Sequence, residues 1–365
     1  MRTKNFIILL CLIIGVSFVL ILFGPQRPES FQTIVSTTHQ QIRNFQDTLR
    51  DAEQKNLIAD EKYLKLLGFT TKPRLYPNDT WHNTSLPVVV TYVFDGQESQ
   101  AIGLINNIGK ILTNNTVLVY NLGLGSYSLQ TLLNYCNSSR CQVVNFNFDE
   151  FPSHVQEERL HAYRPLIIQD ALHKTGAILF LENNQRFTHQ MSSELFDNLF
   201  RSTIKTTGIL TWPMKKAVSS LTHKKMFEYF HTDAENFLFQ QMVDAQRLIL
   251  VNTDHIHQYI MLPWIQCSLT QDCIHPIGAQ SAGCRFDKKP QYRYSGCHSY
   301  DLSALNIVLG LRFKHDSSQY SYRGAKLLFA SVDLETAASE FAELERNQTS
   351  TDGKALSAET AIILH

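Results

Sequence analysis

The chain has 365 residues, and its 33 lysines and arginines balance 33 aspartates and glutamates, so the formal net charge at pH 7 is zero. Without a basic field, the sequence lacks the electrostatic footprint of a nucleic-acid-binding protein, and we expect no nucleic-acid partner. With 44% hydrophobic and 11% aromatic residues, the composition is that of a globular protein with one large or two small domains.

The first predicted element is an uncharged apolar run, Phe6–Phe23, preceded by Arg2 and Lys4. A helix of this length can cross a bilayer core, because about 17–25 apolar residues suffice and the backbone hydrogen bonds close inside the helix. Basic residues before the run favour a cytoplasmic N-terminus. We therefore expect a cytoplasmic tail over 1–5, a transmembrane signal anchor over 6–23, and a type II topology.

The alternative is a cleavable signal peptide, whose apolar core would be about 7–15 residues long and would end in small residues. This run ends in Leu22-Phe23-Gly24-Pro25, with bulky residues where a peptidase requires small ones. A short anchor also favours the thinner membranes of the early secretory pathway. We expect the Golgi membrane, with the plasma membrane as the alternative.

Residues 24–86 are predicted to form a stem or linker. Within them, 31–66 has apolar residues at patchy helical spacing, which is typical of a self-associating stem helix or of a solvated linker helix. The first possibility implies a homodimer formed through the stem. We expect a lumenal domain over 87–346 and a disordered tail over 347–365.

Strands and helices alternate at the start of this domain. Strands are predicted over 86–94, 116–122, 142–148 and 177–181, with helices over 98–112, 128–135 and 157–174. Such an order predicts an α/β fold with a mostly parallel sheet flanked by helices. Ligands bind beyond the carboxyl ends of such strands. The loops 95–99, 123–126 and 182–187 are therefore the expected place of a site.

Six cysteines follow the anchor, and an even number in an oxidising compartment indicates disulfides. They are Cys136, Cys141, Cys267, Cys273, Cys284 and Cys297. The first two are expected to pair with each other and the last four among themselves, in an order that spacing leaves open. The alternative for the last four is a zinc site that includes His298, which the absence of a CxxC element disfavours.

Asn-x-Ser/Thr sequons also lie only after the anchor. They occur at Asn78, Asn83, Asn114, Asn137 and Asn347. Such asparagines accept N-linked glycans when they are exposed in the secretory pathway. Their positions agree with a lumenal domain.

The strand over 177–181 leads into Glu182-Asn183-Asn184. Oxygen ligands at Glu182 and Asn184 suit Mn²⁺ or Mg²⁺, although an amide brings no charge to the metal. Arg164 and Arg186 lie nearby in the sequence and suit bidentate contacts to phosphate. The structural alternative is a strand-end loop of solvated polar groups.

A second polar segment contains His298 and Asp301. Asp301 suits either an N-cap or the orientation of an acceptor hydroxyl, and His298 either a general acid/base or an ordinary loop histidine. Gly123-Leu124-Gly125 lacks the third glycine of a dinucleotide fingerprint. The sequence contains neither Gly-x-Ser-x-Gly nor HExxH, so a secreted hydrolase is disfavoured.

The layout of anchor, stem and lumenal α/β domain resembles that of Golgi glycosyltransferases. Residues 177–184 look like the apolar strand and Asp-x-Asp element of GT-A fold enzymes similar to glycosyltransferase family 8, and 301–306 resembles the Asp-Gln-x-x-Leu-Asn helix start of that group. Residues 163–168, 263–267 and 296–301 resemble more closely a nematode-expanded family of single-pass type II membrane glycoproteins, which implies no reaction.

The resemblance implies a GT-A-like domain that transfers a sugar from a nucleotide-diphosphate sugar to a glycan or protein acceptor. It also implies roles for single residues: Thr91 and Tyr92 beside the nucleotide base, Arg164 at the phosphates, Glu182 and Asn184 at the metal, and Asp301 at the acceptor. However, Glu-Asn-Asn is not Asp-x-Asp, and a C-terminal His-x-x-Gly-x-x-Lys-Pro-Trp stretch is missing. The alternative is a non-catalytic lumenal or cell-surface binding protein on the same fold.

Overall fold

The computed structural model describes residue 14 and residues 55–81, 85–287 and 289–347. The apolar run 6–23, apart from Ile14, most of the stem, Asn83 and the tail 348–365 lie outside these residues. Among the helices that are described, none is both long and apolar enough to span a membrane. The chain divides into two units, Met1–Lys55 and Asn56–His365.

The second unit is built on a six-stranded sheet with the strand order β3-β2-β1-β4-β9-β6. Its strands are β1 (Ser85–Val93), β2 (Asn115–Asn121), β3 (Cys141–Asn145), β4 (Ala177–Leu181), β6 (Ile209–Leu210) and β9 (Arg247–Val251). Strands β1 to β4 pair in parallel, whereas β9 runs antiparallel to both β4 and β6. The predicted α/β fold with a mostly parallel sheet is confirmed.

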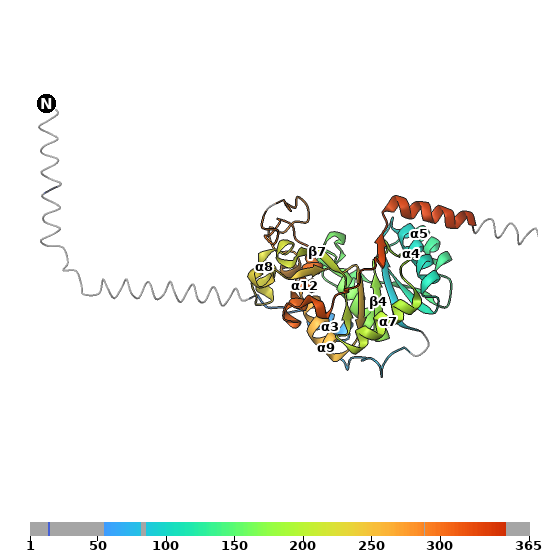
Figure 1. Ribbon diagram of the computed structural model, residues 1–365, viewed down its shortest axis with the longest axis horizontal. Coiled ribbons are helices and arrows are strands. Elements are labelled where there is room, and N and C mark those ends of the chain that lie inside the picture. Colours follow the sequence, from blue (N-terminus) through green and yellow to red (C-terminus); the bar gives the residue numbers. More distant parts are fainter. Residues whose placement is uncertain (1–13, 15–54, 82–84, 288, 348–365) are drawn as a thin grey trace, which may run out of the picture. The chain divides into compact units, whose positions relative to one another are not determined.

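Helices cover both faces of this sheet. One face packs against α6 (Tyr163–Thr175), α8 (Lys224–Tyr229), α10 (Leu262–Leu269) and α12 (Tyr300–Arg312), and the other against α4 (Glu98–Ile111), α5 (Ser126–Tyr135) and α7 (Ser193–Lys205). Figure 1 shows α4 and α5 on one side of β4, with α8 and α12 on the other. Because successive strand residues point to opposite faces, Phe180 belongs to the first core and Leu179 to the second. Strands covered on both faces read as continuous apolar runs, as the central strands β4 and β9 do.

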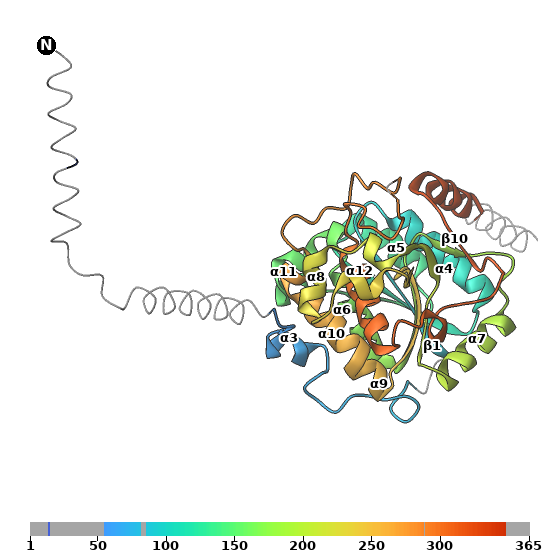
Figure 2. The same ribbon diagram turned by 60° about the vertical axis from the view of Figure 1, so that its left-hand side comes forward.

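Shorter elements complete the unit. They are α3 (Glu61–Leu66), β5 (Gln185–Phe187), β7 (Pro213–Ala217), β8 (Gln241–Val243), α9 (Asp254–Ile256), α11 (Gln271–Ile274) and β10 (Phe329–Ser331), with a helix over 334–347. Strands β5 and β10 pair with each other, as do β7 and β8. Figure 2 shows the helix over 334–347 on the outside of the unit, beside β10 and α4.

Helix α6 begins later than the predicted residue 157. Residues 153–160 instead form two 3₁₀ turns, and the chain takes a left-handed conformation at His161, with φ of 50°, before the helix starts at Tyr163. Pro165 lies in the first turn, as expected, where its missing N–H is not needed. The helix ends at Thr175 and is followed by Gly176, whose φ of 85° suits a C-terminal glycine cap.

The core extends further toward the N-terminus than the predicted domain boundary at residue 87. Leu67 is buried, and its carbonyl accepts a hydrogen bond of 2.9 Å from the Gln169 amide. Tyr63 and Phe69 pack against the same core. The last part of the predicted stem is therefore part of the folded unit.

All six cysteines after the anchor form disulfides. The pairs are Cys136–Cys141, Cys267–Cys273 and Cys284–Cys297. The first pair and the pairing of the last four among themselves are confirmed, and the zinc alternative is wrong because these sulfurs are bonded to each other. Of the predicted glycosylation sites, Asn78, Asn114, Asn137 and Asn347 are exposed.

Candidate functional site

The loops that follow β1, β2 and β4 meet at one edge of the sheet. The Gly125 N–H donates to Asp95 Oδ1 at 3.3 Å, and the Asn183 amide donates to Gln97 Oε1 at 2.7 Å. This is the edge at which parallel strands present their carboxyl ends. The expected position of the three loops is confirmed.

Three charged side chains from distant parts of the sequence meet beside this edge. Arg164 of α6 contacts Glu182, which follows β4, at 2.5 Å, and Asp301 of α12 at 2.8 Å. Their exposed fractions are only 4%, 6% and 1%. We call these three residues the ion triad.

The triad's hydrogen bonding is incomplete. Tyr92 donates its hydroxyl to Glu182 Oε1 at 3.3 Å. Among the described residues, however, Arg164 Nε and Asp301 Oδ1 have no hydrogen-bond partner although both atoms are buried. An unsatisfied buried polar atom costs about 1–3 kcal/mol.

The electrostatics of the triad favour a proton on Asp301. Burial raises the pKa of Asp301 to about 7; the Arg164 charge opposes this change and the Glu182 carboxylate reinforces it. Burial acts against the Arg164 charge, but the two neighbouring carboxylates outweigh it and raise its pKa. Two carboxylates around one cation in a dry site cannot both ionise without leaving an excess charge. We assign the proton to Asp301.

This assignment predicts that Asp301 makes the protein more stable in mild acid. Its folded pKa of about 7 lies above the value of about 3.9 for an unfolded aspartate. The folded state therefore binds more protons, and the stabilising contribution is complete below about pH 4 and lost as the pH rises to about 7. Denaturant midpoints at pH 5.5 and pH 8 should differ less in Asp301→Asn than in the wild type. Equal differences in both proteins would contradict the assignment.

Arg164 and Asp301 line a cavity of about 540 Å³. Its other charged lining residues are Arg159, Lys215, Asp244 and Arg247. Sequence reasoning missed these four, because they do not follow a strand of the predicted parallel set. Arg247 opens β9, which is antiparallel to β4, so its register partner is Leu181 at the end of β4. Only the direction of β9 brings Arg247 to this edge.

Asp301 does not cap its helix. It is the second residue of α12, after the N-cap Ser299, and its carboxylate turns to Arg164 instead. Tyr300 has a φ of 44°, a left-handed conformation that costs about 1–3 kcal/mol in a residue with a side chain. The Trp264 indole N–H donates to the Asp301 carbonyl at 2.9 Å. The hydrogen bonds from Arg164 and Trp264 therefore fix the position of Asp301.

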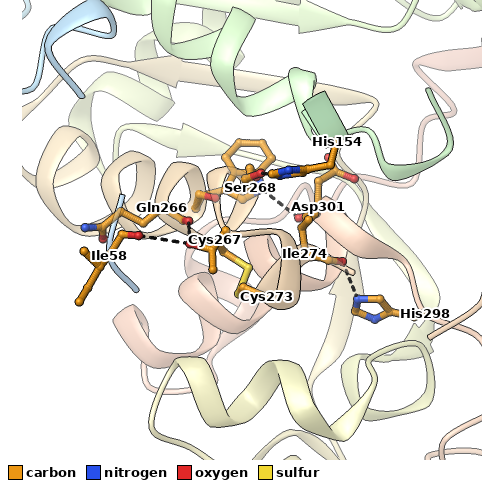
Figure 3. The surroundings of a disulfide bond; sticks show 11 residues. Ile58, His154, Gln266, Cys267, Ser268, Cys273, Ile274, His298 and Asp301 are labelled. Carbon is orange, nitrogen blue, oxygen red and sulfur yellow. Dashed lines mark hydrogen bonds between the residues drawn. A yellow bond between two sulfur atoms is a disulfide. The ribbon is translucent and has the colours of Figure 1, made fainter. Parts of the chain in front are cut away.

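The His298 side chain is buried and hydrogen-bonded to the backbone on both sides, so it is not an exposed acid or base. Its Nδ1 accepts from the His223 N–H at 3.1 Å, and its Nε2 donates to the Ile274 carbonyl at 3.2 Å. Figure 3 shows this second bond next to the Cys267–Cys273 disulfide. Burial lowers the pKa of His298 to about 3. With both nitrogens engaged and the ring neutral, the geometry does not support the predicted general acid/base role.

Thr91 and Tyr92 are buried in β1, and the Tyr92 hydroxyl is engaged with Glu182 of the ion triad. The Tyr92 ring packs edge-on against Tyr163, with centroids 5.2 Å apart. Because β1 is a central strand covered on both faces, the polar side chains available to a ligand at its end are Asp95 and Gln97. The structure thus gives no support to base contacts by Thr91 or Tyr92.

Arg186 is likewise engaged elsewhere. Its guanidinium contacts Glu340, on the helix over 334–347, at 2.8 Å, and donates to the carbonyls of Asn183 and Gln185. Burial lowers its pKa, and the Glu340 contact partly offsets this effect. Arg186 therefore connects β5 to the helix over 334–347 and does not line the cavity.

The residues predicted to bind metal do not form an open metal site. Glu182 Oε1 is held by Arg164 at 2.5 Å, and Asn184 Oδ1 accepts from the Gln185 amide at 2.8 Å. The described residues contain no group of three or more His, Cys, Asp or Glu side chains that could hold a metal ion. A Mn²⁺ or Mg²⁺ ion would compete with Arg164 and Tyr92 for Glu182 Oε1 and with the Gln185 amide for Asn184 Oδ1, so this arrangement does not fit the predicted two-residue role.

No protein-family model and no curated protein matches this sequence. The chain is similar in structure to the WbbM bifunctional glycosyltransferase, with 11% identity over 68% of this chain and a TM-score of 0.40, and it spans only 41% of that protein. It is similar to core-mannan synthase A of Aspergillus fumigatus in its Mn/GDP form, with 11% identity, a TM-score of 0.40, and coverage of 74% of this chain and 91% of that one.

A third similar structure is the galactosyltransferase LgtC in complex with donor and acceptor sugar analogues. It is 8% identical, with a TM-score of 0.32, and the match covers 58% of this chain and 84% of that one. The resemblance to a nematode-expanded family stays a prediction. The chain is thus distantly similar to structures of glycosyltransferases.

Proposed function

We propose that this protein is a glycosyltransferase of the Golgi lumen, held by one membrane-spanning helix. It would transfer a sugar from a nucleotide-diphosphate sugar to a glycan or protein acceptor. The observation that carries the proposal is the joining of two features at one sheet edge: the polar loops 95–99 and 123–126, and the charged cavity beside them. The plasma membrane is the alternative location, and a homodimer formed through the stem is a further prediction of the proposal.

The loops and the cavity suit different parts of such a donor. In this proposal the nucleoside lies at loops 95–99 and 123–126, and the sugar and acceptor lie in the cavity. The Glu158 carboxylate accepts from the Gln97 amide at 2.7 Å, and the neighbouring Arg159 lines the cavity. Arg159 therefore lies between the two regions, where a diphosphate would pass.

Catalysis at such a site would come from positioning and from stabilising the departing diphosphate. The bond between the anomeric carbon and the phosphate oxygen breaks, and its electron pair leaves with the nucleoside diphosphate. The acceptor oxygen forms the new bond to the anomeric carbon, and its proton passes to the departing diphosphate. Arg159 offers a bidentate, charge-assisted contact to the leaving group, and Asp301 orients the acceptor hydroxyl.

A panel of nucleotide sugars tests the proposal. The full-length protein in detergent is incubated with each donor, with and without Mn²⁺, and thermal shift, donor hydrolysis and transfer are measured. We expect one donor to raise the melting temperature and to be turned over. If no donor on the panel shifts the melting temperature, is hydrolysed or is transferred, the proposal fails.

One observation favours a second candidate, a non-catalytic binding protein. Arg164 contacts both Glu182 and Asp301, so each of these two acids already has a partner inside the protein. This candidate predicts that a nucleotide sugar binds without turnover. It falls if transfer is measured and Asp301→Asn abolishes that transfer while the protein remains folded.

A further inference from the structure

We infer that the cavity beside the ion triad recognises an acidic sugar, that is, a pyranose with a carboxylate, phosphate or sulfate group. Lys215 of β7 and Arg247 of β9 would bind the anionic group, and Asp301 a ring hydroxyl. The inference rests on the proposed function, since it names the acceptor that the cavity would select. The preference of the cavity for an acidic sugar depends only on these side chains, so it can be measured without a transfer reaction.

Buried atoms without partners indicate what the ligand must supply. Among the described residues, Arg164 Nε and Arg247 Nε are buried donors without an acceptor, and Asp301 Oδ1 is a buried oxygen without a partner. All three belong to side chains that line the cavity. A ligand that brings acceptor oxygens for the guanidinium N–H groups and a hydroxyl for Asp301 would satisfy all of them.

Among the charged residues around the cavity, one cation has no ion-pair partner within the described part of the chain. Arg247 is ion-paired with Asp244, and Arg159 with Glu157 at 3.0 Å. Arg164 is held by the two acids of the triad. Lys215 is exposed on β7 and has no ion pair within the part of the chain that the structure describes. An ammonium without a carboxylate partner on the cavity wall favours a ligand that brings its own anionic group.

The rest of the lining suits a sugar better than a simple anion. Leu221 and Leu302 provide apolar surface on which the C–H face of a pyranose can lie. The cavity volume, about 540 Å³, is within the range of small-molecule sites and accommodates one or two sugar rings. The cavity thus offers an oxygen that accepts from hydroxyl groups, a cation that binds an anionic group, and apolar side chains that contact a sugar ring. Together, these features match an acidic sugar.

Two neighbouring lysines on one strand provide the matched test. Lys215 lines the cavity, whereas Lys216 lies over the Phe286 ring at 3.6 Å and does not line it. Because only the first of these lysines lines the cavity, one substitution at each position separates a local contact from net charge. Arg247→Lys adds a third variant, which keeps the charge beside Asp244 but removes the Nε donor.

The experiment measures dissociation constants by ligand-observed NMR titration of the full-length protein in detergent. The probes are glucuronic acid, glucose 6-phosphate, glucose 6-sulfate, neutral glucose, and acetate. We expect at least one acidic sugar to bind about tenfold or more tightly than both glucose and acetate, and the tightest probe identifies the anionic group. Lys215→Gln should weaken that binding about tenfold, Arg247→Lys by several fold, and Lys216→Gln should leave it unchanged.

Glucose or acetate binding as tightly as every acidic sugar would overturn the inference, and so would equal losses in Lys215→Gln and Lys216→Gln. Thermal shift with the nucleotide-sugar panel separates this failure from failure of the proposed function. If a nucleotide sugar binds but acidic sugars show no preference, only the inference fails. If acidic sugars bind selectively and no nucleotide sugar binds, the inference stands and the proposed function fails.

Discussion

Replacing Arg164 with methionine is expected to lower the free energy of unfolding by about 3–5 kcal/mol. The substitution leaves Glu182 and Asp301 buried, with no cation between them. Taking one partner from a buried ion pair is costly because the remaining charge lies in a medium of low dielectric constant. Urea unfolding followed by circular dichroism measures the change.

Two further variants show whether charge is the cause. Adding Glu182→Gln and Asp301→Asn to Arg164→Met removes the two acidic groups that the guanidinium contacted, so part of the lost stability should return. Arg159→Met is the matched control, because the Arg159 side chain is 60% exposed and its loss should change stability by no more than about 0.5 kcal/mol. If Arg164→Met costs no more than Arg159→Met, the triad does not stabilise the fold.

Trp264→Ala should have a comparably large effect, with an expected loss of about 3–5 kcal/mol. The side chain is fully buried in the core against which α6, α10 and α12 pack. Truncation removes its apolar contacts and leaves a cavity that the surrounding helices fill only in part. The variant also removes the N–H that holds the Asp301 carbonyl.

Trp264→Phe separates packing from hydrogen bonding. Phenylalanine keeps most of the apolar volume but lacks the N–H, so it should cost less than alanine, about 1–3 kcal/mol. Denaturant unfolding gives both values. Equal losses for the two substitutions would show that the bond to Asp301, rather than packing, accounts for the effect.

The sheet and the disulfides were predictable because their signals are local. Each of β1, β2 and β4 is an apolar run at the predicted place, and the polar loops that follow them meet where parallel strands must end. The Cys136–Cys141 pair was predictable because its cysteines lie close in sequence, whereas spacing left the order of the last four open and the structure supplied it. The start of α6 was missed, since a left-handed residue at 161 leaves no clear signal in the sequence.

The chemistry of the site was less predictable. Arg164, Glu182 and Asp301 were all identified, but as separate ligands for phosphate, metal and acceptor rather than as one ion triad. His298 and Arg186 were predicted to act on a ligand because they are polar. In the structure, both side chains instead bind groups inside the protein. The reason is that sequence spacing says nothing about which charges neutralise each other across 137 residues.

By itself, the sequence determined the α/β order, the site-bearing edge of the sheet and the cysteines that pair, and it predicts the membrane anchor. These properties depend on short-range hydrophobic patterning and on the geometry common to all parallel sheets. Only the tertiary structure decided that Arg164 joins two acids, and that the antiparallel β9 brings Arg247 to the same edge. Burial and charge pairing are collective properties, since each side chain's state depends on neighbours that only the complete fold supplies.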